Sequence, residues 1–162
     1  MINLTIDGKE ICTQKGRTIL EAAREADIYI PTLCHHKRLL PIGSCRICVV
    51  EVDGYDKPMP ACNTPVLEGI SVTTQSDRLS RMRREFIKLL LVSHPTDCPQ
   101  CDKGGECRLQ DIVYENEIVS AEYASFREDK KEAYATPLIR YWELRCILCG
   151  RCYRACREVS GR

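Results

Sequence analysis

Eleven of the twelve cysteines in this chain fall into three groups whose spacing suits metal–sulfur chemistry. Thiolates are soft ligands that bind iron strongly, and an iron–sulfur cluster needs several of them held at short, fixed separations. A chain with three such groups in series is expected to transfer electrons rather than to transform a substrate. The three groups are Cys34, Cys45, Cys48 and Cys62; then His94, Cys98, Cys101 and Cys107; then Cys146, Cys149, Cys152 and Cys156.

The first group combines three neighbouring cysteines with one from further along the chain. Cys34, Cys45 and Cys48 lie in one predicted loop, and Cys62 follows a predicted hairpin. This arrangement suits a [2Fe–2S] cluster with two thiolates on each iron. The glycine and serine before Cys45 allow the backbone to curl and to aim amide groups at the sulfurs, which would raise a reduction potential. The alternative is a structural zinc site with four cysteine ligands.

The second group opens with a histidine. His94, Cys98, Cys101 and Cys107 are separated by three, two and five residues. A histidine that follows an apolar helix is usually a capping or surface residue. Here it supplies the fourth ligand that three cysteines lack, so we expect His94 to bind iron. Gly104-Gly105 permits a tight turn before the last cysteine.

The third group has the ligand spacing of bacterial two-cluster ferredoxins, in which the fourth cysteine serves the other cluster. Two residues separate Cys146 from Cys149 and Cys149 from Cys152, and three residues separate Cys152 from Cys156. The next residue, Arg157, stands where a proline often follows. The pattern indicates a cubane cluster, with Cys156 directed toward a further one.

Cys12 and the pair His35-His36 lie outside these groups. Cys12 falls in the second predicted strand, where a small buried apolar residue would fit, so we expect it not to bind iron. His35 and His36 have no cluster to complete and are expected to be loop residues. A thiol redox enzyme with paired cysteines is a further alternative for the chain, although it leaves the other cysteines of each group without a role.

The segments around the first group predict a small module of strands and one helix. Alternating apolar residues predict strands at 2–6, 10–13, 47–52 and 70–73. A helix is predicted at 19–26, with Thr18 as its cap. We expect the first group to lie in the loops of this module.

The segments around the second group predict helices at 78–92 and 108–114, followed by a short strand within 138–142. The first of these helices has helical spacing of apolar residues. Its predicted buried stripe is Leu79, Met82, Phe86, Leu89 and Leu90. Its basic residues are expected to form a solvated face, with a docking surface as the alternative: Arg78, Arg81, Arg83, Arg84 and Lys88.

Composition limits the setting of the protein. A net charge of +1 argues against strong attraction to nucleic acid or to an anionic membrane. No apolar run approaches the ~20 residues of a membrane span, and the N-terminus lacks the features of a secretory signal. We expect a reducing cytoplasm, with the cytoplasmic face of a membrane complex as the alternative. Two Phe and one Trp make thin cores, so bound clusters should contribute to stability.

The order of the three groups resembles that of one family, the N-terminal iron–sulfur region of the large (75-kDa-type) iron–sulfur protein of respiratory complex I. Similar regions occur in NAD-linked formate dehydrogenases, iron hydrogenases and the diaphorase part of NAD-reducing hydrogenases. The resemblance covers essentially the whole chain. It is carried by the motifs at 30–34, 43–48, 62–66, 94–101, 104–107 and 146–152.

This resemblance implies an α+β chain of four parts. A β-grasp [2Fe–2S] ferredoxin-like domain would occupy residues 1–77. A small helical and loop [4Fe–4S] domain, with one His and three Cys ligands, would occupy 78–118. A connector would follow at 119–137, and the start of a bacterial-ferredoxin-like [4Fe–4S] domain at 138–162.

The resemblance also implies which residues bind each cluster. Cys34, Cys45, Cys48 and Cys62 would hold the [2Fe–2S] cluster, and His94, Cys98, Cys101 and Cys107 a [4Fe–4S] cluster. Cys146, Cys149 and Cys152 would supply three ligands of another [4Fe–4S] cluster, whose fourth ligand lies outside the chain. We expect this cluster to be incomplete here, completed by a longer polypeptide or a partner. Cys156 would serve a further cluster, which favours the formate dehydrogenase and hydrogenase branches.

The function implied by the resemblance is that of an iron–sulfur electron-transfer module in a multisubunit NAD(P)H-linked oxidoreductase. It would relay single electrons between a flavin-bearing, NAD(P)H-binding subunit and a terminal redox subunit of molybdopterin, hydrogenase or quinone-reducing type. The sequence has no G-x-G-x-x-G dinucleotide loop, so catalysis would belong to the partners. The alternative from another class is a structural zinc-binding interaction module.

Overall fold

The computed structural model describes residues 1–120 and 134–161, and these residues form two compact units. One unit comprises Met1–Arg83 with Gly150–Arg162, and the other is Arg84–Cys149. The predicted terminal segment 138–162 is therefore divided between the units. Most of the predicted connector 119–137 lies outside the described residues.

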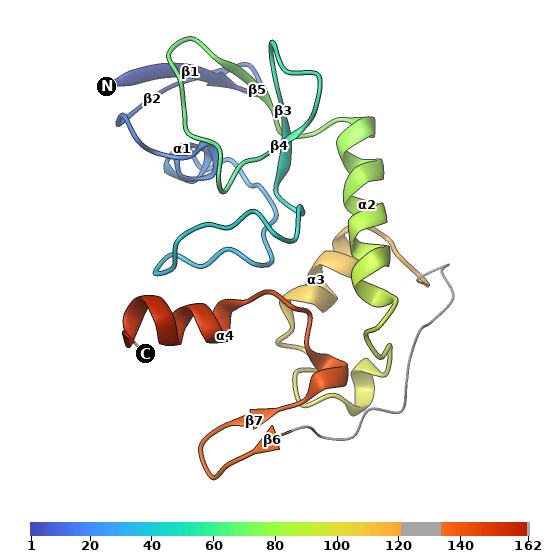
Figure 1. Cartoon of the computed structure of the whole chain (residues 1–162). Coiled ribbons are helices and arrows are strands. Elements are labelled where there is room, and N and C mark those ends of the chain that lie inside the picture. Colours follow the sequence, from blue (N-terminus) through green and yellow to red (C-terminus); the bar gives the residue numbers. More distant parts are fainter. Residues whose placement is uncertain (121–133, 162) are drawn as a thin grey trace. The chain divides into compact units, whose positions relative to one another are not determined.

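A five-stranded mixed sheet forms the framework of the first unit (Figure 1). The order of its strands is β2-β1-β5-β3-β4, with β1 parallel to β5 and the other pairs antiparallel. This is the strand order of the predicted β-grasp fold. The short strand β4 was not predicted. The strands are β1 (Ile2–Ile6), β2 (Lys9–Thr13), β3 (Val49–Val52), β4 (Met59–Pro60) and β5 (Ser71–Thr73).

Helix α1 (Ile19–Glu25) supplies the other half of the core of this unit. Its side chains Ile19, Leu20 and Ala23 are buried with Leu4 and Val72 from the sheet. Alternation along the strands places one apolar set against the helix, because successive strand residues face opposite sides. The sheet and the helix thus form the rigid body from which the ligand loops of the first group extend.

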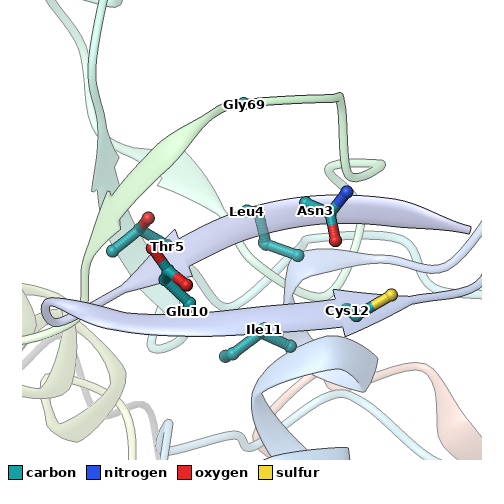
Figure 2. Close-up of a pocket in the computed structure, with 7 residues that line it drawn as sticks. All are labelled: Asn3, Leu4, Thr5, Glu10, Ile11, Cys12 and Gly69. Carbon is teal, nitrogen blue, oxygen red and sulfur yellow. The ribbon is translucent and has the colours of Figure 1, made fainter.

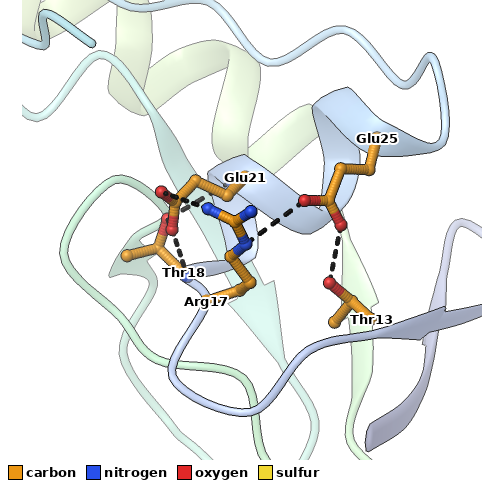
Figure 3. A network of polar contacts seen from close by, with 5 residues as sticks. All are labelled: Thr13, Arg17, Thr18, Glu21 and Glu25. Atoms are coloured by element: carbon orange, nitrogen blue, oxygen red, sulfur yellow. Dashed lines mark hydrogen bonds and ion pairs between the residues drawn. The ribbon is translucent and has the colours of Figure 1, made fainter. Parts of the chain in front are cut away.

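The start of α1 is fixed by polar contacts, as the sequence predicted (Figure 3). The backbone N–H of Glu21 donates to the Thr18 hydroxyl (3.2 Å), and the Thr18 N–H donates to the Glu21 carboxylate (2.8 Å). This reciprocal capping satisfies donors that the first helical turn leaves unpaired. Arg17 lies within 3.4 Å of Glu21 and 3.3 Å of Glu25, and Thr13 donates to Glu25 (2.7 Å). These contacts tie α1 to the end of β2.

Helix α2 (Asp77–Leu91) begins near the predicted residue, but its buried face differs from the prediction. Its fully buried positions are Leu79, Arg83, Ile87 and Leu91, which are four residues apart. Leu89, predicted to be buried, is 58% exposed. Residues at i and i+4 lie one above the other on a helix, so a single row turns inward. The prediction was wrong at Leu89 because it followed apolarity and passed over the arginine in that row.

Arg83 was predicted to lie on a solvated face, and that prediction is wrong. Its side chain is 7% exposed. The guanidinium donates to the carbonyl oxygens of Ile47 (3.2 Å), Val49 (2.7 Å) and Thr74 (2.8 Å). Burial lowers the pKa of Arg83, yet an arginine remains charged in proteins. The charge is tolerated inside because three backbone acceptors surround it.

The second unit consists of short elements joined by loops. Buried Leu109 and Ile112 anchor its helix α3, which confirms the helix predicted at 108–114. The strand predicted within 138–142 is limited to β7, which pairs with β6 in a hairpin. No helix in the part of the chain that the structure describes is long and apolar enough to cross a membrane. The elements are η1 (Cys98–Gln100), α3 (Arg108–Glu115), β6 (Tyr134–Ala135), β7 (Arg140–Tyr141) and η2 (Glu143–Arg145).

A helical segment that the sequence did not predict completes the first unit. It consists of α4 (Arg151–Arg154) and the π-helical turn η3 (Ala155–Val159). We refer to it as the 151–159 helix. It carries the last two cysteines of the third group.

Cys12 lies on the exposed side of β2 rather than in the core, so the expectation of a buried position is wrong. Strand β2 buries Ile11 and Thr13, and the alternation of side chains therefore turns Cys12 outward. Figure 2 shows it at an open pocket of about 420 Å³ on the β1–β2 hairpin. None of the residues that line this pocket belongs to the three ligand groups.

Candidate metal centres

The first group is built around the pairing of β3 with β4. Cys48 directly precedes β3, and one residue, Ala61, separates the end of β4 from Cys62. Val49 lies opposite Pro60, and the Ala61 N–H donates to the Cys48 carbonyl (3.0 Å). This register places Cys48 and Cys62 together. Both are buried, as is Cys34 in the preceding loop, whereas Cys45 is half-buried.

The four thiols of the first group interact in two pairs. The neighbouring Cys45 side chain lowers the pKa of Cys34 to about 5, against the opposing effect of burial. In the same way the neighbouring Cys48 side chain lowers the pKa of Cys62. The pKa values of Cys45 and Cys48 are raised. Two pairs fit a [2Fe–2S] cluster, which takes two thiolates on each iron.

Backbone amides point at the sulfurs of the first group. The Cys34 N–H donates to the sulfur of Cys45 (3.4 Å). The backbone of Ser44 and Cys45 lowers the pKa of Cys34, and the backbone of Gly43 lowers that of Cys62. Gly43 has a φ of +59°, a conformation that residues with side chains rarely adopt. The structure thus has the amide donors that the sequence predicted around Cys45. Such donors stabilise negative charge on thiolates.

Three arginines hold the loops of the first group, and sequence reasoning missed all three. Arg83 of α2 binds the carbonyls of Ile47 and Val49, on either side of Cys48. From the 151–159 helix, Arg154 and Arg151 bind carbonyls near Cys34. The contacts are Arg154 to Cys34 (2.9 Å) and Leu40 (2.6 Å), and Arg151 to Leu33 and His35 (2.8 Å for His35). The position of Arg83 in the apolar row of α2 was the one signal available in the sequence.

The second group lies along the loop between α2 and α3, where all four members are half-buried. His94 follows the end of α2, Cys98 opens η1, and Cys107 caps the N-terminus of α3. The Cys101 N–H donates to the Cys98 carbonyl (3.1 Å), and the Lys103 N–H to the Cys101 sulfur (3.5 Å).

Gly104 allows this loop to fold tightly. A Cβ at residue 104 would lie 2.8 Å from the carbonyl oxygen of Cys98 and 3.2 Å from that of Cys101. Both contacts are with backbone, which cannot move aside as a flexible side chain can. The absence of a side chain at Gly104 therefore sets how closely the two cysteine segments approach, as the sequence predicted.

Arg145 braces the same loop. Its guanidinium donates to both carboxylate oxygens of Asp97 (2.9 and 3.1 Å), next to Cys98. It also lies 4.8 Å from the centroid of the Trp142 ring. The hydrogen bond from Arg145 lowers the pKa of Asp97. The residue before the third group thus supports the second group.

The third group is not contained within one unit. Cys146 and Cys149 are half-buried in the second unit, and Cys152 and Cys156 are exposed in the first. Cys146 follows η2, whereas Cys152 and Cys156 lie on the 151–159 helix.

The arrangement of side chains can be compared with what a single metal ion requires. Among residues 1–120 and 134–161, no three His, Cys, Asp or Glu side chains are arranged to hold one ion. A structural zinc ion needs four ligands directed at one point.

Two segments of the chain match known sequence families. Residues 1–77 match the family described as the 2Fe-2S iron-sulfur cluster binding domain. Residues 83–120 match the NADH-ubiquinone oxidoreductase-G iron-sulfur binding region. These two segments are thus similar to iron–sulfur regions that include one of the NADH-ubiquinone oxidoreductase-G type. This confirms the resemblance identified from the ligand groups, and it gives no support to the zinc alternative.

Curated relatives match nearly the whole chain. NADPH-Fe(3+) oxidoreductase subunit alpha of Geobacter sulfurreducens is 51% identical over 161 residues, which are 99% of this chain and 19% of that protein. A subunit of the NADH-quinone oxidoreductase of Rhizobium meliloti is 42% identical over 166 residues, with coverage of 99% and 19%. The NADH-ubiquinone oxidoreductase 75 kDa subunit of Reclinomonas americana is 37% identical over 161 residues, with coverage of 99% and 23%. The chain spans about a fifth of the length of these relatives.

A solved structure shares the fold. It is the crystal structure of an NAD+-reducing [NiFe]-hydrogenase in the H2-reduced state, with a TM-score of 0.85 and 34% sequence identity. The match covers 97% of this chain and 66% of that one. Together with the two family matches, it confirms a mixed α+β chain with a [2Fe–2S] ferredoxin-like domain and a [4Fe–4S] binding region.

Proposed function

We propose that this chain is an iron–sulfur electron-transfer module of a multisubunit NAD(P)H-linked oxidoreductase. It relays single electrons between a flavin-bearing, NAD(P)H-binding subunit and a terminal redox subunit. The observation that carries the proposal is the first cysteine group, with its two thiol pairs and inward-pointing amides. Further support comes from relatives that are named as NADH-quinone and NADPH-Fe(3+) oxidoreductase subunits.

In this proposal Cys34 and Cys45 bind one iron of the [2Fe–2S] cluster, and Cys48 and Cys62 bind the other. The bound cluster supplies a site that accepts and releases one electron. The protein contributes a buried setting and fixed amide donors, which compensate for the charge of four thiolates. Because these donors are part of the backbone, they need little rearrangement when the charge changes.

We propose that His94, Cys98, Cys101 and Cys107 hold the [4Fe–4S] cluster. Nδ1 of His94 lies 2.8 Å from the carbonyl oxygen of Pro95. A proton on Nδ1 would be donated to that carbonyl, and Nε2 would then present its lone pair to iron. A hydrogen bond of this kind is the usual support of a metal-binding histidine.

We further propose that Cys146, Cys149 and Cys152 supply three ligands of another [4Fe–4S] cluster, and that Cys156 serves a further one. The organisation proposed is a [2Fe–2S] domain at 1–77, a [4Fe–4S] domain at 78–118, a connector at 119–137 and a partial ferredoxin-type domain at 138–162. A reducing, cytoplasmic setting fits this assignment, because none of the twelve cysteines forms a disulfide in the structure.

The test is anaerobic purification and reconstitution of the full chain, followed by iron and sulfide analysis and EPR spectroscopy. We expect brown protein with a [2Fe–2S] signal on partial reduction. Colourless protein loaded with zinc would contradict the proposal.

The histidine ligand is tested with His94→Ala, and His36→Ala serves as the matched control. We expect His94→Ala to lose or convert the [4Fe–4S] signal while the [2Fe–2S] signal persists, and His36→Ala to keep both. Unchanged iron content and unchanged spectra in His94→Ala would show that the histidine is not a ligand.

A further inference from the structure

The loop that carries Cys34 is held by residues more than a hundred positions away in the sequence. Arg151 and Arg154 of the 151–159 helix together donate to four carbonyl groups of residues 33–40. The same helix also accepts a hydrogen bond, since the Leu40 N–H donates to Glu158 (2.7 Å). Loop backbone that is removed from water needs such partners. The conformation of the loop therefore depends on this helix.

Arg154 is the central residue of this contact. It is 2% exposed, although long charged side chains are rarely buried completely. One of its nitrogens donates to the carbonyl of Cys34 (2.9 Å) and another to that of Leu40 (2.6 Å). A third donates to Gly150 (3.2 Å), in the preceding turn. The guanidinium is thus fixed in one orientation beside a proposed cluster ligand.

The charge of Arg154 is held next to Cys34, because the guanidinium donates to the Cys34 carbonyl (2.9 Å). A fixed cation beside a ligand favours additional negative charge on a metal centre bound to that ligand. Because Arg154 is 2% exposed, solvent and salt screen its charge less than that of a surface arginine.

We propose that Arg154 is a positioning residue that raises the reduction potential of the [2Fe–2S] cluster bound by the first cysteine group. The proposal rests on the proposed function, since it requires that cluster. Reduction adds one electron to a centre that four thiolates already make negative, and a fixed buried cation favours the more negative state. Because the guanidinium keeps its proton throughout the working range, the effect does not change with pH.

The experiment is an EPR-monitored redox titration of the reconstituted full chain and three variants. Arg154→Gln removes the charge and keeps a hydrogen-bond donor. Arg154→Lys keeps the charge and loses the planar donor group. Arg157→Gln is the matched control, because Arg157 is exposed on the same helix and its replacement changes the net charge equally.

We expect Arg154→Gln to lower the midpoint potential of the [2Fe–2S] cluster. At a fixed solution potential, the ratio of reduced to oxidised cluster should fall roughly tenfold. For a one-electron couple this corresponds to a shift of about 59 mV. Arg154→Lys and Arg157→Gln should stay near the wild-type value. The difference between Arg154→Gln and the wild type should be the same at about pH 6 and about pH 9.

Two outcomes would overturn the inference: an unchanged potential in Arg154→Gln, or equal shifts in Arg154→Gln and Arg154→Lys, which would indicate a structural role alone. If Arg154→Gln binds no cluster, a lowered potential in Arg154→Lys would refute the role of the charge, because that variant keeps it. Absence of a [2Fe–2S] signal in the wild-type protein would instead refute the proposed function.

Discussion

The first and third cysteine groups each have four thiols, but the surroundings of these thiols differ. The first is mostly buried, its thiols are paired, and its loops are tied by Arg83 and Arg154 to distant parts of the first unit. In the third group Cys152 and Cys156 are exposed, and its members are divided between two units. Arg151 and Arg154, which lie between its cysteines, donate to the loop of the first group, and Arg145, which precedes it, donates to that of the second. The fold of one unit thus brings the first group together, whereas no single unit contains the third group.

The largest effect is expected from a change within the preformed site. Cys48→Ser replaces a buried thiol whose partner is Cys62, so the [2Fe–2S] signal should disappear completely. The [4Fe–4S] signal of the second group should remain. Iron analysis and EPR spectroscopy of the reconstituted chain measure both. A wild-type [2Fe–2S] spectrum in Cys48→Ser would contradict the assignment of the first group as the [2Fe–2S] site.

A second prediction concerns the support of the first group rather than its ligands. Arg83→Met leaves the carbonyls of Ile47, Val49 and Thr74 without their donor, and it should lower the free energy of unfolding by about 3 kcal/mol. Arg81→Met, on the exposed side of the same helix, should change it by less than about 0.5 kcal/mol. Urea denaturation of both variants under anaerobic conditions tests this. Equal stabilities would mean that the buried arginine does not hold these loops.

A third prediction concerns the exposed group. We expect the isolated chain to hold about six irons firmly, in one [2Fe–2S] and one [4Fe–4S] cluster. Cys156→Ala should leave that iron content unchanged. About ten irons in the wild type, with loss of about four in Cys156→Ala, would show that Cys156 closes a third cubane. The first and third groups would then differ only in how exposed their thiols are.

The smallest effect is expected at Cys12, the cysteine outside all three groups. Cys12→Ala should retain the full iron content and change the free energy of unfolding by less than about 0.5 kcal/mol, because the side chain is exposed. Iron analysis and urea denaturation would check this prediction. Loss of the [2Fe–2S] signal in this variant would mean that the cluster depends on Cys12 as well as on the four cysteines of the first group.

Much of this architecture could be predicted from local sequence signals. Thr18 marked the start of α1, and alternating apolar residues marked β1 and β2. The spacing of the cysteines was enough to define the three groups. These features depend on residues that are close in sequence, where the geometry of helices and strands is regular.

The buried arginines could not be predicted in the same way. Arg154 binds a carbonyl 120 positions away, and Arg83 binds one 36 positions away. Backbone carbonyls are present at every residue, so no sequence motif marks an acceptor. Arginine is expected at the surface from its charge alone. Only the folded chain shows where a guanidinium, instead of water, donates to a backbone carbonyl. For the same reason, the grouping of residues 150–161 with the first unit was not anticipated.

The contact between the 151–159 helix and residues 33–40 has a consequence for how this protein can change in evolution. The family matches end at residue 77 and residue 120, yet the loop that carries Cys34 depends on Arg151 and Arg154. A gene rearrangement that moved residues 1–77 alone would leave several loop carbonyls without these donors. We therefore expect the ferredoxin-like domain and this helix to be inherited together, and substitutions in one to be accompanied by substitutions in the other. The structural unit that supports the first cysteine group is discontinuous in the sequence.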